Sequence, residues 1–401
     1  MIDSSATIVR TESSATAARR RKLIVFSDDW GRHPSSCQHL VRPLLARLDV
    51  TWVNTIGMRP PRWNWETVRR GIQKLGDWRP GRHPSPRDNG LSPRVVNPVM
   101  WPSFRSRWGK YVNRKALGRA VRKAIGDSKE PATILTTIPV IADLINEMPE
   151  AYCVYYCVDD FSTWPGLDGL TLSRMEQQLV DYANCIVTAG ENLTRRIRRL
   201  GRESAVLTHG VDLDFWRVPA EEAESPTILR EIPRPIVMFW GLIDRRLDVD
   251  YLAVLGDSLT AGTIVLVGPE QDPDPRLDTI ANLRRIGPVR FAELPRLAAQ
   301  ADLLIMPYAN VAVTQSMQPL KLKEYLATGK PVVVRQLPAT HDWNDCLDAV
   351  EHPAEFAAAA CERLRGGLPA SQLEARRRLS AEGWSAKSDR LERILFPDPP
   401  T

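Results

Sequence analysis

Residues 314–336, TQSMQPLKLKEYLATGKPVVVRQ, decide how the second half of this chain folds. They predict a loop, a short helix and a buried strand. Pro319 suits the first helical position, where its missing N–H leaves no hydrogen bond unmade. Gly329 favours the end of the helix, and Pro331 prevents its continuation. Residues 332–334 are a β-branched run, which is typical of a strand covered on both faces.

The helix in this stretch has two different faces. Leu322, Tyr325 and Leu326 follow the i, i+3, i+4 spacing of a buried stripe. Lys321 and Glu324 are three residues apart and therefore neighbours on the remaining face. A cation and a carboxylate beside the free amides of a helix N-terminus would suit a diphosphate attached to a sugar. Spacing alone also allows a solvated ion pair on a surface helix.

The pattern P-x-K-x-x-E-Y-L-A-x-G-K-P-V-V at residues 319–333 resembles the nucleotide-sugar site of GT-B glycosyltransferases. Within that fold it is similar to teichuronic acid glycosyltransferases and more distantly to the xanthan glucuronosyltransferase. The resemblance implies that Glu324 contacts the donor ribose, that Lys321 contacts the diphosphate, and that Gln318 belongs to the same site. Many retaining relatives carry a second glutamate eight positions earlier, where this chain has Ser316. A retaining mechanism is therefore not implied.

The resemblance covers nearly all of residues 22–396 and implies an α/β architecture. Two Rossmann-like domains would place their parallel sheets on either side of an interdomain cleft. The expected organisation is a disordered tail, an acceptor-binding domain, a linker, a nucleotide-sugar-binding domain and a helix that crosses back to the first domain. These parts are expected at residues 1–20, 21–217, 218–235, 236–375 and 376–396, respectively.

The alternation of strands and helices along the chain also indicates parallel sheets. Strands are expected at residues 22–27, 50–56, 132–138, 151–158, 184–189, 235–241, 263–268, 289–291, 302–308 and 332–334. Helices are expected at residues 38–48, 113–125, 141–146, 172–182, 191–200, 248–257, 295–301, 353–365 and 374–395.

A second motif of the donor site lies at residues 239–248, FWGLIDRRLD. It resembles the family's strand-end loop G-x-x-x-x-R-x-D, which Gly241, Arg246 and Asp248 match. Preorganised cations stabilise the negative charge that develops on a leaving diphosphate. We therefore assign Arg246 to the donor site ahead of Arg245, although a surface contact between Arg246 and Asp248 is the alternative.

Two aromatic residues complete the expected donor site. Phe291 and Tyr308 lie in segments that match the family's nucleoside-lining segments. The base would sit at the C-terminal ends of the strands, as ligands do in open parallel sheets. Tyr308 could cover the base or reach a phosphate, or it could be a core aromatic at a strand end.

The expected catalytic base lies in the first half, in YYCVDDFSTWPG at residues 155–166. Asp159 and Asp160 follow a buried strand, where one of them could deprotonate an acceptor hydroxyl. Inverting relatives use an aspartate for this task, and capping of the following turn is the alternative. In the loop SDDWGRHPSS at residues 27–36, Gly31 is expected near the diphosphate or acceptor, and His33 is a further candidate base.

The charge distribution is strongly asymmetric. Residues 59–123 hold 17 Lys and Arg against three acids, and five tryptophans lie among them. We interpret residues 59–110 as a functional insertion. Basic residues mixed with Trp are typical of a surface that adheres to an anionic membrane. Nucleic-acid binding and an ordinary basic face are the alternatives, and nucleic acid is not the expected partner.

Composition argues against membrane-spanning, secreted and metal-binding proteins. No apolar run approaches the roughly 20 residues of a membrane-spanning helix, and residues 23–26 are too short for a signal-peptide core. The chain is therefore expected in the cytoplasm, peripheral on the inner face of the plasma membrane. Six scattered cysteines form no C-x-x-C pair, and six histidines show no metal-binding spacing. We expect no bound metal and no cofactor other than the nucleotide-sugar substrate.

Together these features predict a metal-independent glycosyltransferase. It would move a sugar from a nucleoside diphosphate sugar, with a UDP-sugar as the expected donor, to a hydroxyl of a lipid-linked or polysaccharide acceptor in cell-surface or exopolysaccharide synthesis. One alternative is a nucleotide-sugar 2-epimerase of the same fold, which has no need of a basic acceptor surface. Another is a non-catalytic membrane- or nucleic-acid-binding protein, against which the Lys321–Glu324 pair argues.

Overall fold

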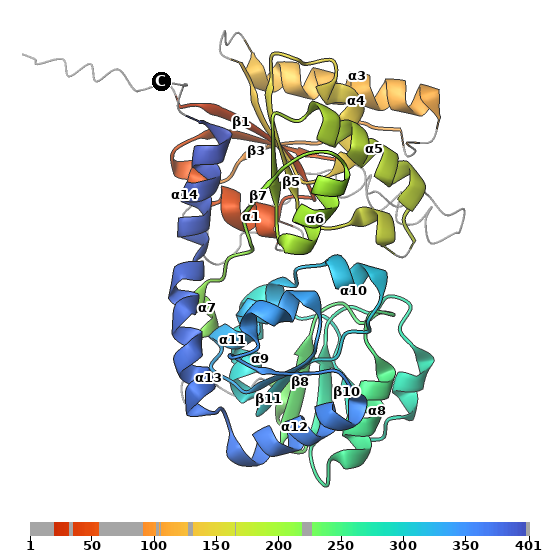
Figure 1. The fold of residues 1–401 in the computed structure, drawn as a ribbon, viewed down its shortest axis with the longest axis vertical. Helices are drawn as coiled ribbons and strands as arrows, with labels where there is room; N and C mark the ends of the chain where they lie inside the picture. Colours follow the sequence, from red (N-terminus) through yellow and green to blue (C-terminus); the bar gives the residue numbers. More distant parts are fainter. Residues whose placement is uncertain are drawn as a thin grey trace, which may run out of the picture.

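The computed structural model describes residues 20–31, 35–55, 91–101, 104, 106–126, 131–164, 166–218 and 227–397. The expectations for the tail, for His33 and for most of the insertion at 59–110 lie outside these residues. The described chain forms two bodies, each built around one sheet (Figure 1).

The first sheet has seven parallel strands among the described residues, in the order β3-β2-β1-β4-β5-β6-β7. Apolar β-branched and aromatic residues fill its central strands, which are buried on both faces. The strands are β1 (Lys22–Ser27), β2 (Asp49–Asn54), β3 (Arg94–Val96), β4 (Thr133–Thr136), β5 (Tyr152–Cys157), β6 (Cys185–Thr188) and β7 (Ala205–Val206).

The second sheet has six parallel strands in the described part of the chain, in the order β10-β9-β8-β11-β12-β13. The β-branched run at the end of the opening stretch forms β12, between β11 and β13. The strands are β8 (Ile236–Trp240), β9 (Thr263–Val267), β10 (Leu283–Arg285), β11 (Leu303–Met306), β12 (Val332–Arg335) and β13 (Asp348–Val350).

Helices connect successive strands and cover the sheets (Figure 1). In the first body these are α1 (Ser36–Val41), α3 (Arg107–Ile125), α4 (Ala142–Ile145), α5 (Gly169–Tyr182) and α6 (Glu191–Arg199). Helix α7 (Leu213–Trp216) lies in the crossover between the bodies. The second body contains α8 (Val249–Ser258), α9 (Leu294–Gln300), α10 (Ala312–Ser316), α11 (Leu320–Ala327), α12 (Pro353–Gly366) and α13 (Ala370–Ala375), and α14 (Trp384–Leu395) ends the described helices.

Two separate apolar clusters form the cores, one around each sheet. The first contains Leu391 and Leu395 of α14, although their neighbours in sequence belong to the second body. Figure 1 shows this helix running from the second body to the first. The Ser388 hydroxyl donates to the carbonyl oxygen of Leu40 at 2.7 Å, so the end of the chain is fastened to the first body.

Several expected helices and strands have different bounds in the structure. The helix expected at 38–48 ends at Val41, because Pro43 starts a separate 3₁₀ turn, Pro43–Ala46. The helix expected at 374–395 is divided into α13, a 3₁₀ segment and α14, with Gly383 at the last break. The strand expected at 289–291 lies instead at β10, and Phe291 begins the 3₁₀ turn Phe291–Glu293.

Other elements carry too weak a sequence signal for prediction. Helix α3 begins at Arg107, six residues before its expected start, because Ser106 accepts a hydrogen bond from the amide of Gly109 and caps it. Helix α10 and the short strands β3 and β13 were not expected at all. Each has six residues or fewer, too few to show a period.

Candidate active site

The Lys321 ammonium group lies at the edge of the second sheet where the strands end. Its Nζ donates to the Tyr308 hydroxyl at 2.5 Å and lies 5.0 Å from the centre of the Phe239 ring. Gly241 follows β8 with a φ of +147°, and a methyl group at this position would collide with the ammonium group. Glycine is therefore required here both by the backbone and by Lys321. Tyr308 is buried and contacts Lys321, so it is both a core aromatic and part of this site.

Glu324 lies one helical turn after Lys321. The Trp240 indole Nε1 donates to its Oε2 at 3.5 Å. Burial raises the pKa of the Glu324 carboxyl to about 7, while Trp240 and Lys321 act in the opposite direction. At neutral pH this carboxylate is therefore easily protonated, unless a ligand or a neighbour stabilises its charge. Leu322, Tyr325 and Leu326 are buried, which confirms the expected inward face of the helix.

The two neighbouring arginines have different environments. Arg246 is only 8% exposed, and its Nε donates to both carboxylate oxygens of Asp244 at 3.0 Å. Arg245 is half-exposed and lies 3.6 Å from Asp272. The alternative contact between Arg246 and Asp248 is wrong, because Asp248 pairs with Arg335 at 2.5 Å. Arg246 is thus the arginine that is fixed at the strand end.

The two adjacent aspartates after β5 also differ. Asp160 is buried, caps the turn Phe161–Thr163 by accepting from the Ser162 amide at 3.1 Å, and pairs with Arg196 at 3.0 Å. Asp159 is partly buried, and burial raises the pKa of its carboxyl to about 6. The Trp164 side chain and the Arg246 guanidinium oppose this rise in pKa. Capping thus occupies Asp160, whereas Asp159 retains a titratable carboxyl near neutral pH.

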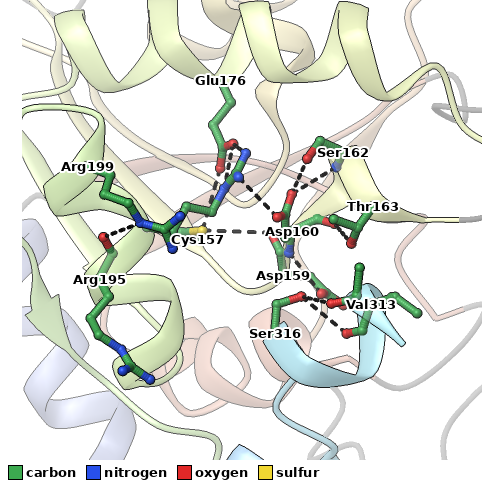
Figure 2. A network of polar contacts seen from close by, with 12 residues as sticks. Cys157, Asp159, Asp160, Ser162, Thr163, Glu176, Arg195, Arg199, Val313 and Ser316 are labelled. Atoms are coloured by element: carbon green, nitrogen blue, oxygen red, sulfur yellow. Dashed lines mark hydrogen bonds and ion pairs between the residues drawn. The ribbon is translucent and has the colours of Figure 1, made fainter. Parts of the chain in front are cut away.

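Arg196 joins Asp160 to a third acid that the sequence did not single out. Glu176 of α5 is buried, pairs with Arg196 and accepts from the Tyr155 hydroxyl at 2.9 Å. Figure 2 draws this network with Asp160, Ser162 and Glu176 labelled. The only sequence signal was an acid on the apolar stripe of a helix. Such an acid needs a buried cation, and Arg196 supplies it.

Contacts between the two bodies bring these groups together. The Arg246 guanidinium lies over the Trp164 ring, 5.0 Å from its centre. The Asn192 side chain of α6 donates to the carbonyl oxygen of Gln315 at 2.6 Å. Gln318 packs against Gly190, where a methyl group would collide with its side chain. The end of β5 in the first body therefore faces the N-terminal side of α11 in the second.

The other residues predicted for the site have contacts of their own. Gly31 has a φ of +76°, and its amide donates to the Gln38 side chain at 3.0 Å. Phe291 stacks on Phe215 of the crossover, with ring centres 4.8 Å apart. Ser316 has no carboxylate, and its hydroxyl donates to the carbonyl oxygens of Ala312 at 3.1 Å and Val313 at 3.2 Å (Figure 2). His33 lies outside the described residues.

Lys323 is the main residue that sequence reasoning missed. It lies between the two predicted ligand residues of α11, but its ammonium group points to the crossover. It donates to the His209 carbonyl oxygen at 2.5 Å and pairs with Glu382. Lys387 of α14 pairs with the same carboxylate at 2.8 Å. A charged residue next to the buried stripe was the only signal, and its partners are more than 50 residues away in sequence.

Within the described residues, no group of three or more His, Cys, Asp or Glu side chains is arranged to hold a metal ion. The expectation that the protein needs no metal or cofactor stays a prediction.

Comparison with known proteins gives a family match in the second body and a curated relative. Residues 234–365 match the family described as glycosyl transferases group 1. TuaH of Bacillus subtilis (strain 168), named as a teichuronic acid biosynthesis glycosyltransferase, is 29% identical over 207 residues. The alignment covers 49% of this chain and 52% of TuaH, so the chain spans about half the length of this curated relative.

Solved structures extend the likeness to the whole fold. Sucrose-phosphate synthase from Thermosynechococcus elongatus has a TM-score of 0.66 at 15% identity, covering 94% of this chain and 98% of that one. Anabaena HepE, solved in complex with UDP-glucose, has a TM-score of 0.66 at 11% identity, covering 93% and 99%. The sequence resemblance to GT-B glycosyltransferases is confirmed at the level of the fold.

Replacement Asp159→Asn should stabilise the protein at neutral pH. Because the folded-state pKa of Asp159 lies above the usual 3.8, folding becomes less favourable as the pH rises from about 4 to 6 and the carboxyl ionises. We expect the asparagine to add about 1–2 kcal/mol to the unfolding free energy at pH 7.5, after allowance for partial exposure, and to add little near pH 4. Thermal unfolding of both proteins across this pH range measures the difference.

Asp160→Asn is the matched control. It removes a buried ion-pair partner and a cap, so it should lower the melting temperature at neutral pH. If Asp159→Asn raised the unfolding free energy equally at every pH, or lowered it at pH 7.5, the environment described for Asp159 would be contradicted.

Proposed function

From the GT-B fold and the match of residues 234–365 to glycosyl transferases group 1, we propose that the chain transfers a sugar from a nucleoside diphosphate sugar to an acceptor hydroxyl. The observation that supports this most is a pair of cations, Lys321 and Arg246, beside Tyr308 at the end of the second sheet, with Arg246 close enough to Asp159 of the first body to lower the pKa of its carboxyl. Such a pairing of cations with a base across two domains suits a displacement that releases an anion.

In the proposed reaction, Asp159 accepts the proton of the acceptor hydroxyl. The acceptor oxygen forms a bond to the anomeric carbon while the bond from that carbon to the diphosphate oxygen breaks. Lys321, Arg246 and the first amides of α11 stabilise the negative charge that the diphosphate gains. A base whose pKa is about 6 is ionised at neutral pH and still basic enough to accept a proton. Attack from the side opposite the leaving group inverts the anomeric centre.

Asp160 has a supporting role in this mechanism. Its carboxylate is held by Arg196 and by the amide of Ser162, so it fixes the backbone that carries Asp159. Arg245 and Phe291 are assigned to the rim of the donor site, Gln318 to its inner wall, and Gly31 to the facing loop. His33 stays a further candidate base.

Relatives suggest the donor and the acceptor. HepE was solved with UDP and with UDP-glucose, and TuaH is named for teichuronic acid biosynthesis. We therefore assign a UDP-sugar as donor and a hydroxyl of a lipid-linked or polysaccharide acceptor, in cell-surface or exopolysaccharide synthesis and without a metal. A 2-epimerase or a non-catalytic protein would share the nucleotide site, but neither accounts for a base facing it together with a basic outer surface.

The basic outer surface of the first body indicates where the protein would meet its acceptor. Helix α3 carries seven Lys and Arg residues and no acid. It lies on the side of the first body that faces away from the second (Figure 1). Trp108 is 59% exposed on it, packs edge-on against Trp101, and is followed by Tyr111, which is 50% exposed. Cations beside exposed indole and phenol rings suit the headgroup region of an anionic bilayer.

We therefore propose peripheral contact of this surface with the inner, cytoplasmic face of the plasma membrane. No helix in the described ranges is long and apolar enough to cross a membrane.

A thermal-shift panel of nucleoside diphosphates tests the donor site. UDP at about 100 times its dissociation constant should stabilise the wild-type protein by about 2.7 kcal/mol, which is several degrees in melting temperature. Lys321→Ala removes a charge-assisted contact with the diphosphate and should weaken binding by tenfold or more. Lys330→Ala, the same change at the far end of the helix, should keep the shift. Equal shifts in both variants would show that the diphosphate binds elsewhere.

Vesicle sedimentation tests the membrane surface. The wild-type protein should bind vesicles of phosphatidylglycerol and not vesicles of phosphatidylcholine, and added salt should weaken binding because charge attraction is screened. Trp108→Ala and Tyr111→Ala should each lower binding several-fold. Tyr182→Ala, which removes a ring that is 49% exposed outside this surface, is the control. Binding that is indifferent to lipid charge, or equally reduced by the control, would contradict the proposal.

A further inference from the structure

We propose that Trp240 is a positioning residue of the donor site, which holds the Glu324 carboxylate through its indole N–H and links it to the crossover between the two bodies. The inference rests on the proposed function, because it assigns Glu324 to the donor ribose. Trp240 lies in the stretch 239–248, but the pattern matched there begins at Gly241, so no role was assigned to Trp240 from the sequence.

Trp240 fixes two successive residues of α11. It is the last residue of β8 and is 3% exposed. Its indole Nε1 donates to Glu324 at 3.5 Å, and its backbone amide donates to the Tyr325 hydroxyl at 3.0 Å. The next residue, Gly241, makes room for Lys321. One strand end therefore touches both residues assigned to the donor.

The indole ring is held on two sides, which fixes the direction of its N–H. Its centre lies 4.1 Å from the Tyr325 ring, at an interplanar angle of 61°. The Trp216 ring lies nearly parallel to it, at 9° and 5.2 Å. Trp216 belongs to α7 in the crossover and is itself buried. A shift of the crossover would therefore move Trp240, and with it the group that Glu324 contacts.

The consequence concerns the charge of Glu324. The ionised Glu324 can accept a hydrogen bond from a ribose hydroxyl at each of its oxygens, whereas protonation turns one of these oxygens into a donor. Burial raises its pKa to about 7, and Trp240 and Lys321 are the groups that lower it. The other charged or titratable groups around this part of α11 are Tyr308, whose hydroxyl contacts Lys321, the buried Tyr325, and the Lys323–Glu382 pair. Among all of these groups, including Lys321, Trp240 is the one whose N–H donates directly to the Glu324 carboxylate.

Trp240→Phe keeps an aromatic ring in the stack and removes the N–H. The pKa of Glu324 should then rise by about half a unit to one unit. We compare the dissociation constant for UDP of the Trp240→Phe variant with that of the wild-type protein, as a ratio. This ratio should be about three to ten at pH 5.5 and about one near pH 9, where Glu324 is ionised in both proteins. Taking the ratio at each pH removes the ionisation of UDP itself. Isothermal titration calorimetry measures both constants.

Two controls and one replacement variant make the result decisive. Trp343→Phe, the same change at a tryptophan beside Lys323, should give a ratio that does not vary with pH. In a Glu324→Gln background, Trp240→Phe should likewise lose its pH dependence. Should the phenylalanine variant not fold, replacing Trp240 with benzothienylalanine preserves the ring shape and still removes the N–H, and the same ratio is expected.

A ratio for Trp240→Phe that is constant from pH 5.5 to 9 would overturn the positioning role, because loss of packing alone weakens binding equally at every pH. Failure of the wild-type protein to bind UDP at all would instead overturn the donor assignment on which the inference rests.

Discussion

One buried ammonium group, that of Lys323, fastens together three segments that meet between the two bodies. It joins helix α11, the carbonyl oxygen of His209 in the crossover, and Glu382 before α14. Burial lowers the pKa of Lys323 to about 8, against the opposing effect of Glu382. An unpaired charge at this position would be expensive, so the three segments must meet for the protein to fold as it does. Helix α11 and the crossover are therefore held together as one unit.

The acids near the centre fall into two groups with different physical roles. Asp160 and Glu176 share Arg196, and their charges are compensated within the first body. For Asp159 and Glu324, burial raises the pKa above its usual range, and the opposing effects are only partial. The first pair makes the scaffold rigid. The second pair leaves charge that is only partly compensated at the proposed places of the sugar hydroxyl and the ribose, and binding of those groups would offset part of the cost of burial.

Sequence reasoning was strongest where a pattern is local. The helix and strand after Met317 follow from proline, glycine and a β-branched run within 20 residues, and both sheets follow from the alternation of elements. The relative roles of Asp159 and Asp160 could not be predicted, because they depend on Arg196, which is 36 residues away. The same holds for Trp240, whose partners come from α7 and α11. Such contacts are fixed by the packing of the two sheets and leave no period in the sequence.

The central claim is that a nucleoside diphosphate lies between Asp159 and the start of α11. A crystal structure of the protein with UDP tests it most directly. The account predicts the diphosphate within hydrogen-bond distance of Lys321 and Arg246, with the ribose hydroxyls on Glu324 and the Asp159 carboxyl facing the terminal phosphate. UDP bound elsewhere, or bound there with Glu324 turned away from the ribose, would contradict it.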